Sequence, residues 1–287
     1  MTRISRREML QSGALAGVFA ASGGPLMARG VRGGRLRAGL SGASASDSWD
    51  MRGATGLFML TAGQGAVFEC LTEVAADGAL KGELAESWTS RDGARSWDIA
   101  LRRGIVFHNG AELTAQDVLA TLEHHGAEPA LLAQIESVAL MGTHDLRITL
   151  HAPNPSFLYE LSHPTLAIQP ANAQGMGVGT GLYRTLHFAP GARFLGQRVD
   201  DHWKGDSAGF ADEVELIALN SAREQRAALK AGVVDVVSDL GVAAVGEMRG
   251  IRTQGTIAMT ARVQTPVTIG QSLPMDNARF AQRWWLA

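Results

Sequence analysis

The segment from Gly82 to Leu122 constrains the fold of this chain more than any other stretch of its sequence. Within it, Trp97, Ile99 and Leu101 alternate with more polar residues, and a period of two is typical of a β-strand with one buried face. Asn109-Gly110 indicates a tight turn, because both residues tolerate the backbone angles that a reversal needs. The segment therefore predicts a half-buried strand followed by a turn.

A helix is predicted directly after this turn. Thr114 can cap its N-terminus, and Asp117 lies three residues later, where a carboxylate favours the free amides of the first turn. Val118, Leu119 and Leu122 then mark one apolar face. These patterns predict secondary structure, and they carry no functional information by themselves.

Composition bounds the class of protein. The chain has 287 residues, of which 46% are hydrophobic and 19% are charged, as in soluble globular proteins. Its formal net charge of -2 gives no electrostatic reason to expect a nucleic-acid partner. We also expect the protein to be a monomer. Cys70 is the only cysteine, so no internal disulfide forms, and its apolar neighbours predict a buried, unreactive thiol.

The sequence shows no zinc-binding helix motif and no redox pair of cysteines. HExxH and CxxC are both absent. The glycines of Gly175–Gly181 lack the spacing of a phosphate loop, and the residues from Leu182 onward predict a strand where a helix would be needed. His124 and His125 are neighbours on a helix and do not share a face. We therefore expect no catalytic residue, no metal site and no cofactor.

The order of residues in the first segment is more informative than its parts. Read as LAESW, W-x-I-x-LR-x-GI-x-FHNG and LTA-x-DV, it closely resembles the N-terminal signature of family 5 solute-binding proteins, the extracytoplasmic receptors of peptide and nickel ABC importers. Three later stretches also resemble the family, namely ITL-x-x-PNP-x-FLYEL, GTG-x-Y-x-x-x-x-F-x-PG and E-x-x-x-AL-x-AG-x-VDVV. The match is long and ordered, so it is far more specific than a short motif.

The resemblance implies an α/β fold of the two-lobed type II periplasmic binding protein class, with mixed sheets and flanking helices. It also implies a division of the chain, of which we expect mainly the N-terminal lobe with its inserted small domain. The main domain would combine residues 35–61 with 179–263, and the inserted domain would be residues 62–178. Residues 264–287 would begin a second lobe that is missing, so we expect a C-terminally truncated receptor.

Residues 1–34 are expected to be an export signal. Arg6 and Arg7 lie in a stretch that resembles the twin-arginine motif, and a short run of small and apolar residues follows. A basic arm beside an apolar helix is the alternative interpretation. The pattern favours export by the twin-arginine route and a periplasmic location.

The resemblance implies that the protein is no enzyme and captures a solute by hinge closure before delivering it to permease subunits in the membrane. A peptide is the commonest ligand of the family, and nickel chelates, oligosaccharides and opines are the alternatives. The candidate ligand-binding residues, chosen by position, are Ser48, Trp49, Asp50, Phe68 and Glu73. Trp49 either forms a wall of the cleft or packs onto its neighbours, and a single lobe is expected to bind solute with negligible affinity.

Two other interpretations remain at this point. The first is a truncated receptor fragment that has lost its transport function. The second is an exported enzyme on an α/β scaffold, because twin-arginine export often carries cofactor proteins. That alternative would require a catalytic constellation, which the sequence does not show.

Overall fold

A computed structural model describes residues 33–54, 56–75, 78–126, 132–205 and 208–239. Its strands are β1 (Arg35–Leu40), β2 (Thr72–Val74), β3 (Leu80–Gly82), β4 (Ala85–Arg91), β5 (Ser96–Leu101), β6 (Ile135–Leu140), β7 (Asp145–Leu150), β8 (Tyr183–Ala189), β9 (Arg193–Arg198), β10 (Glu213–Ala218) and β11 (Val236–Val237). Its α-helices are α2 (Leu57–Ala62), α3 (Ala115–His125), α4 (Phe157–Glu160) and α5 (Ala222–Lys230). The expected export signal with Arg6 and Arg7, and the expected start of a second lobe at residues 264–287, lie outside the described residues.

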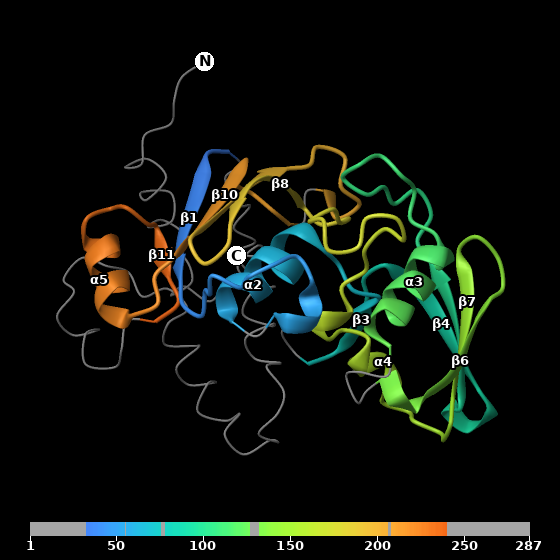
Figure 1. The fold of residues 1–287 in the computed structure, drawn as a ribbon. Helices are drawn as coiled ribbons and strands as arrows, with labels where there is room; N and C mark the ends of the chain where they lie inside the picture. The colour runs from blue at the N-terminus through green and yellow to red at the C-terminus, as the bar shows by residue number, and fades with distance from the viewer. Residues whose placement is uncertain (1–32, 55, 76–77, 127–131, 206–207, 240–287) are drawn as a thin grey trace, which may run out of the picture.

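A five-stranded sheet with the order β11-β1-β10-β9-β8 forms one side of the molecule (Figure 1). Strand β1 pairs in parallel with β10 and β11, whereas β9 is antiparallel to both β10 and β8. Arg35 on β1 lies opposite Glu213 on β10, although 178 residues separate them in the sequence. A large part of the chain is therefore inserted between two neighbouring strands of this sheet.

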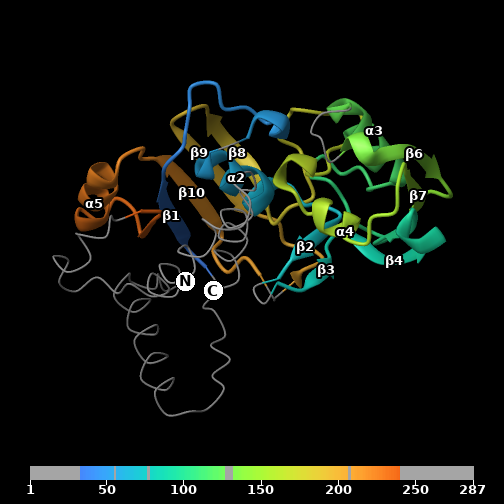
Figure 2. The same ribbon diagram turned by 90° about the horizontal axis from the view of Figure 1, so that it is seen from below.

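The inserted part forms a four-stranded antiparallel sheet with the order β4-β5-β7-β6 and a two-stranded ribbon of β2 and β3. Trp97, Ile99 and Leu101 of β5 are buried, as the alternation predicts. Helix α3 begins where the capping pattern places it, because the Thr114 N–H donates to the Asp117 carboxylate at 2.9 Å. Figure 2 shows the same elements from below, with the ribbon between the two sheets.

Two clusters of buried apolar side chains follow the two sheets. The first joins the four-stranded sheet to α3 and α4. The second joins the five-stranded sheet to α2 and includes Ala62, Val67, Phe68 and Cys70 from the stretch that leaves α2. The mixed sheets and flanking helices confirm the α/β fold class. The exact domain boundaries at residues 61 and 178 stay a prediction.

Two stretches of chain connect the sheets and run side by side. The first leaves α2 through the π-helical turn Gly63–Val67, and the second returns before β8. The Gly181 N–H donates to Val67 O at 2.9 Å and so joins them. At Gly179 the two backbones approach so closely that an added β-carbon would lie 2.0 Å from Val67 O. None of the helices in the described ranges is long and apolar enough to cross a bilayer.

Candidate ligand-binding residues and the buried charge cluster

The loop that follows β1 carries three of the five candidate ligand-binding residues. Ser48 is exposed and Asp50 is half-buried, whereas Trp49 between them exposes only 8% of its surface. The loop is fastened to the main sheet through Asn220, whose side chain accepts from Ala43 N at 3.1 Å and donates to Ala43 O at 3.0 Å. The loop is therefore held in one place beside the C-terminal end of β1.

The Trp49 ring packs within the second apolar cluster. Its centroid lies 5.8 Å from that of Phe68 and 5.7 Å from that of Phe194, both edge to face, and 4.5 Å from that of Phe188. Such arrangements bury a large aromatic area in favourable geometry. The ring is thus enclosed by its neighbours in the described structure, and a role for Trp49 in holding solute stays a prediction.

Gly177 lets the backbone lie against this ring, which leads to a testable expectation. A β-carbon at Gly177 would lie 2.6 Å from Trp49 Nε1. We expect Gly177→Ala to lower the free energy of unfolding by about 2 kcal/mol in urea titrations. Gly175→Ala is the matched control, because Gly175 has a similar positive φ and no atom within 4 Å of an added β-carbon. Equal losses in the two variants would show that the ring contact contributes nothing.

Asp50 is engaged by its own loop. Its carboxylate caps the short 3-10 helix Met51–Gly53 and lies 2.6 Å from Arg52 Nη2, and His124 Nε2 lies 4.0 Å away. The hydrogen bond from Arg52 is the main cause of the lowered pKa of Asp50. Any cation that binds Asp50 must therefore compete with Arg52.

The remaining two candidates lie further along the chain. Phe68 is fully buried, between Trp49 and a cavity of about 360 Å³. Glu73 lies on β2 at the rim of the same cavity, with 25% of its side chain exposed. The structure therefore places Ser48, Trp49 and Asp50 on one loop and Glu73 at the rim of the cavity, with Phe68 in contact with both regions.

The cavity lies beside the β2–β3 ribbon, and Figure 2 shows this ribbon between the two larger sheets. Its lining residues are Gln64, Gly65, Ala66, Phe68, Glu69, Glu73, Lys81, Gly82, Glu83, Gly181, Leu182, Trp203, Lys204 and Ala208. They come from both connecting stretches, the ribbon and the turn after β9. Residues far apart in the sequence therefore meet around one polar cavity.

A buried charge cluster lies on the wall of this cavity, and sequence reasoning missed it. Lys204 Nζ lies 2.5 Å from Glu83 Oε1 and 3.2 Å from Glu69 Oε1, and both carboxylates expose only 4% of their side chains. Trp203 Nε1 donates to Glu69 at 2.9 Å, and the Cys70 N–H donates to Glu83 at 2.7 Å. The sequence feature that could have indicated this cluster is Glu69, a charged residue inside the apolar run 67–71.

The His202 imidazole lies beside this cluster. Its Nδ1 accepts the Lys204 N–H at 3.1 Å, so that nitrogen carries no proton. Its Nε2 donates to Thr180 O at 3.0 Å and lies 3.5 Å from Glu69 Oε1. The buried part of the cluster therefore contains two carboxylates and one cation.

The pKa values of the cluster follow from burial and from these contacts. Burial alone would raise the pKa of Glu69, but Lys204, His202 and Trp203 outweigh it and lower that pKa to about 2. Burial is also the largest effect on Glu83, and with the neighbouring carboxylates it raises the pKa of Glu83 to about 8 despite Lys204. Burial opposes the charge of Lys204, yet its three glutamates raise its pKa. Glu83 thus retains a proton near neutral pH.

This protonation makes a prediction about stability. The pKa of Glu83 is raised in the folded state, so its contribution to stability is fully present below its ordinary pKa of 4.5 and is lost as the pH rises through about 8. We expect wild type to lose about 3 kcal/mol more than Glu83→Gln between pH 5 and pH 8 in urea unfolding. A difference between the two proteins that does not change with pH would contradict the assignment.

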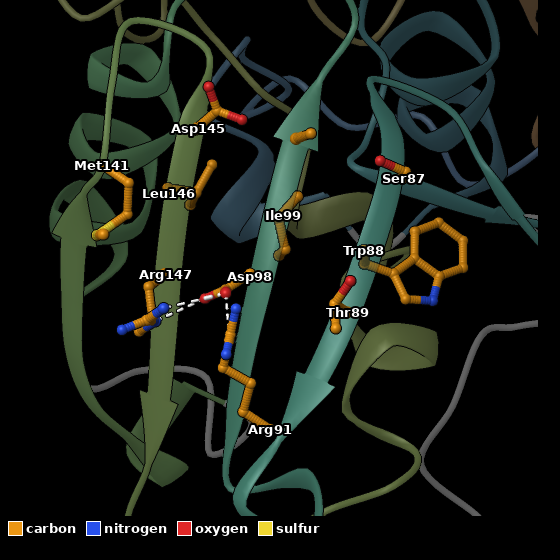
Figure 3. Close-up of a pocket in the computed structure, with 11 residues that line it drawn as sticks. Ser87, Trp88, Thr89, Arg91, Asp98, Ile99, Met141, Asp145, Leu146 and Arg147 are labelled. Carbon is orange, nitrogen blue, oxygen red and sulfur yellow. Dashed lines mark hydrogen bonds and ion pairs between the residues drawn. The ribbon is translucent and has the colours of Figure 1, made fainter.

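A second depression, of about 350 Å³, lies on the outer face of the four-stranded sheet (Figure 3). Asp98 on β5 lies there between two arginines, with Arg147 Nη2 at 3.0 Å and Arg91 Nε at 2.5 Å. The hydrogen bond from Arg147 is the largest of the causes that lower the pKa of Asp98 to about 2. These charges satisfy one another, and no candidate ligand-binding residue lines this face.

The described residues offer little chemical reactivity. Burial raises the pKa of the Cys70 thiol well above its ordinary value, which disfavours the nucleophilic thiolate. Within the described ranges, no group of three or more histidine, cysteine or acidic side chains is placed to hold a metal ion. The polar groups of the cavity are suited to binding through hydrogen bonds and charge.

Comparison with known proteins agrees with this architecture. The model of the family "Bacterial extracellular solute-binding proteins, family 5 Middle" matches residues 79–280. A nickel ABC transporter structure from Bacillus halodurans is 26% identical with a TM-score of 0.67, over 76% of this chain and 46% of that one. DppA from Helicobacter pylori in complex with the peptide STSA is 20% identical with a TM-score of 0.66, over 77% and 49%, and it shows the fold.

Curated relatives give the same result. The nickel-binding periplasmic protein of Escherichia coli K12 is 34% identical over 107 residues, which are 35% of this chain and 20% of the relative. The oligopeptide-binding protein AppA of Bacillus subtilis is 24% identical over 177 residues, which are 54% and 32%. The matches span about half of the solved relatives and a third or less of these curated ones.

The fold is that of the type II periplasmic binding proteins. Within that class, this chain belongs to family 5 of the bacterial extracellular solute-binding proteins.

Proposed function

We propose that this chain forms the first lobe of the substrate-binding component of an ABC importer, which captures a peptide-like solute outside the cytoplasmic membrane. The observation that carries the proposal is the family match over residues 79–280. A peptide is favoured because several relatives bind peptides, among them AppA and the glutathione-binding protein GsiB of Escherichia coli K12, 33% identical over 112 residues. The loaded receptor would then dock on the permease subunits.

The proposed mechanism is closure of two lobes around the solute. A solute that contacts both lobes only in the closed state favours that state by the free energy of the added contacts. On this chain, the exposed Ser48 and the carboxylates of Asp50 and Glu73 are the proposed contacts, with Trp49 and Phe68 supporting them from beneath. The opposite contacts would come from the second lobe of this fold. The chain spans about half the length of its solved relatives.

Three further parts of the proposal concern the organisation of the protein. The main domain combines residues 35–61 with 179–263, and the inserted domain is residues 62–178. The stretch with Arg6 and Arg7 directs export to the periplasm by the twin-arginine route. Fusing residues 1–34 to a reporter that functions only after twin-arginine export tests the last part, with a double Arg6→Lys, Arg7→Lys variant as the inactive control.

Calorimetric titration of two proteins tests the function. One is the 287-residue chain, and the other is the same chain extended by the second lobe of AppA. The ligands are dipeptides, oligopeptides, glutathione, a nickel-histidine complex and an opine. We expect micromolar peptide binding, worth about 8 kcal/mol, by the extended protein and no measurable heat from the chain alone.

Cooperative thermal unfolding of both proteins establishes beforehand that each is folded. Binding of the nickel complex alone would replace the peptide as the proposed solute. A folded two-lobed protein that binds no ligand of the panel would reject the receptor function. Micromolar binding by the single lobe would reject the requirement for a second lobe.

A further inference from the structure

The cavity beside the β2–β3 ribbon is lined by three glutamates, Glu69, Glu73 and Glu83, and by two lysines, Lys81 and Lys204. Lys204 Nζ lies 2.5 Å from Glu83, 3.2 Å from Glu69 and 3.6 Å from Glu73 at the rim. One ammonium group thus faces three carboxyl groups, of which Glu83 retains a proton near neutral pH, and His202 Nδ1 accepts a backbone N–H. Buried carboxylates are stable when cations or hydrogen-bond donors compensate them. The cluster therefore has room for one more cation.

The other two cations near the cavity are engaged elsewhere or lie at its outer edge. Arg102 is stacked on the Trp203 ring at 4.4 Å from the centroid, and its Nε donates to the backbone carbonyl of Glu83 at 2.6 Å. Lys81 is exposed on β3. Among the described residues no ion pair links either side chain to the three carboxylates. Among the lysines and arginines that the structure describes, Lys204 is therefore the one within ion-pair distance of the three glutamates.

An unsatisfied acceptor on the same wall is an independent indication of a ligand. Gln64 exposes 6% of its surface, and its Nε2 donates to Ser162 O at 3.1 Å and to Cys70 Sγ at 3.3 Å. These bonds fix the orientation of the amide, and its Oε1 then accepts no hydrogen bond from any described residue. Glu83 reaches the same Cys70 through the backbone N–H. Gln64 and Glu83 therefore both contact Cys70, and both line the cavity.

We propose that this cavity binds a small primary ammonium ion, whose three N–H groups donate to Glu83, to Glu73 and to Gln64 Oε1. An ammonium group has three donors and no acceptor, which matches a set of acceptors with surplus negative charge. The carbon chain of the ligand lies against Phe68 and Leu182, and the 360 Å³ volume admits a short alkyl group. The site lies within this chain, so it depends neither on a second lobe nor on the proposed receptor function.

Nuclear magnetic resonance titration of the full chain tests the proposal. The indole N–H signal of Trp203, assigned with a Trp203→Phe variant, reports on the site because this group donates to Glu69. n-Butylammonium chloride is the probe, and n-butanol at equal concentration and ionic strength is its neutral counterpart. We expect a saturable shift with a Kd of about 1 mM for the ammonium ion and none for the alcohol. Alanylalanine tests whether the site prefers a free amine to a peptide amino terminus. Binding of this dipeptide would bring the carboxylate of alanylalanine into an acidic cavity.

Two variants identify the acceptors. Glu73→Gln at the rim and Glu83→Gln inside are each expected to weaken n-butylammonium binding about tenfold. Glu73 is partly exposed, so its variant remains informative if the Glu83 variant fails to fold. Glu136→Gln on β6, an exposed carboxylate paired with Arg95, is the control and should bind like wild type. Equal shifts with butanol, no saturable shift, or wild-type affinity in Glu73→Gln would each overturn the proposal.

Discussion

Gly179→Ala is expected to lower the free energy of unfolding by about 3 kcal/mol or more, because the two connecting stretches meet there backbone to backbone. A β-carbon at this position would lie 2.0 Å from Val67 O and 2.5 Å from the Phe68 ring. A flexible side chain could move away, but a backbone carbonyl moves only together with the neighbouring residues of the chain. The substitution should therefore separate the stretches or distort the turn Gly63–Val67. Urea unfolding followed by tryptophan fluorescence measures the loss.

Gly53→Ala is the matched control for this prediction. Gly53 has no atom within 4 Å of an added β-carbon and no positive φ, so alanine should change stability by less than about 0.5 kcal/mol. The Gly181 N–H donates to Val67 O at 2.9 Å, and Gly181→Ala, with its β-carbon 2.3 Å from Ala66 O, should behave like Gly179→Ala. Wild-type stability in both variants would mean that the two stretches do not pack as described.

The sequence predicts well those features that depend on neighbours in the chain. The alternation of Trp97, Ile99 and Leu101 identifies the buried face of β5. The capping box of Thr114 and Asp117 marks the start of α3, where Asp117 accepts the Thr114 N–H at 2.9 Å. Both rest on periodicity or on spacing within one turn of helix, so local physical chemistry is sufficient.

The charge cluster could not be predicted in the same way. Lys204 contacts Glu83 across 121 residues, and Trp203 contacts Glu69 across 134. Contacts at such separations are set by how the connecting stretches cross, which no local pattern reports. Trp49 illustrates the same limit, because its burial depends on Phe188 and Phe194 from β8 and β9. Position within the family resemblance therefore pointed to residues in the loop after β1, and only the fold revealed the polar cavity.

Lys204→Met is expected to destabilise the protein by about 3–5 kcal/mol at neutral pH. Methionine keeps most of the side-chain length and removes the only cation within ion-pair distance of both buried glutamates among the described residues. Breaking a buried ion pair by deleting one partner leaves an uncompensated charge in a low dielectric, so the loss exceeds that of a surface pair. Chemical denaturation at pH 7, with circular dichroism as the signal, measures the change.

The pH dependence of this loss separates charge from packing. In wild type the pKa of Glu69 is lowered to about 2, so its stabilising contribution is present above its ordinary pKa and is lost only as the pH falls through about 2. Without Lys204, burial raises the pKa of Glu69, and the folded variant gains stability as the pH falls. The difference between wild type and Lys204→Met should therefore shrink from pH 7 to pH 5. A loss that is constant over this range would assign the effect to packing alone. Lys230→Met, an exposed lysine at the end of α5, should cost at most about 1 kcal/mol at either pH, because it loses only a favourable interaction with the helix dipole.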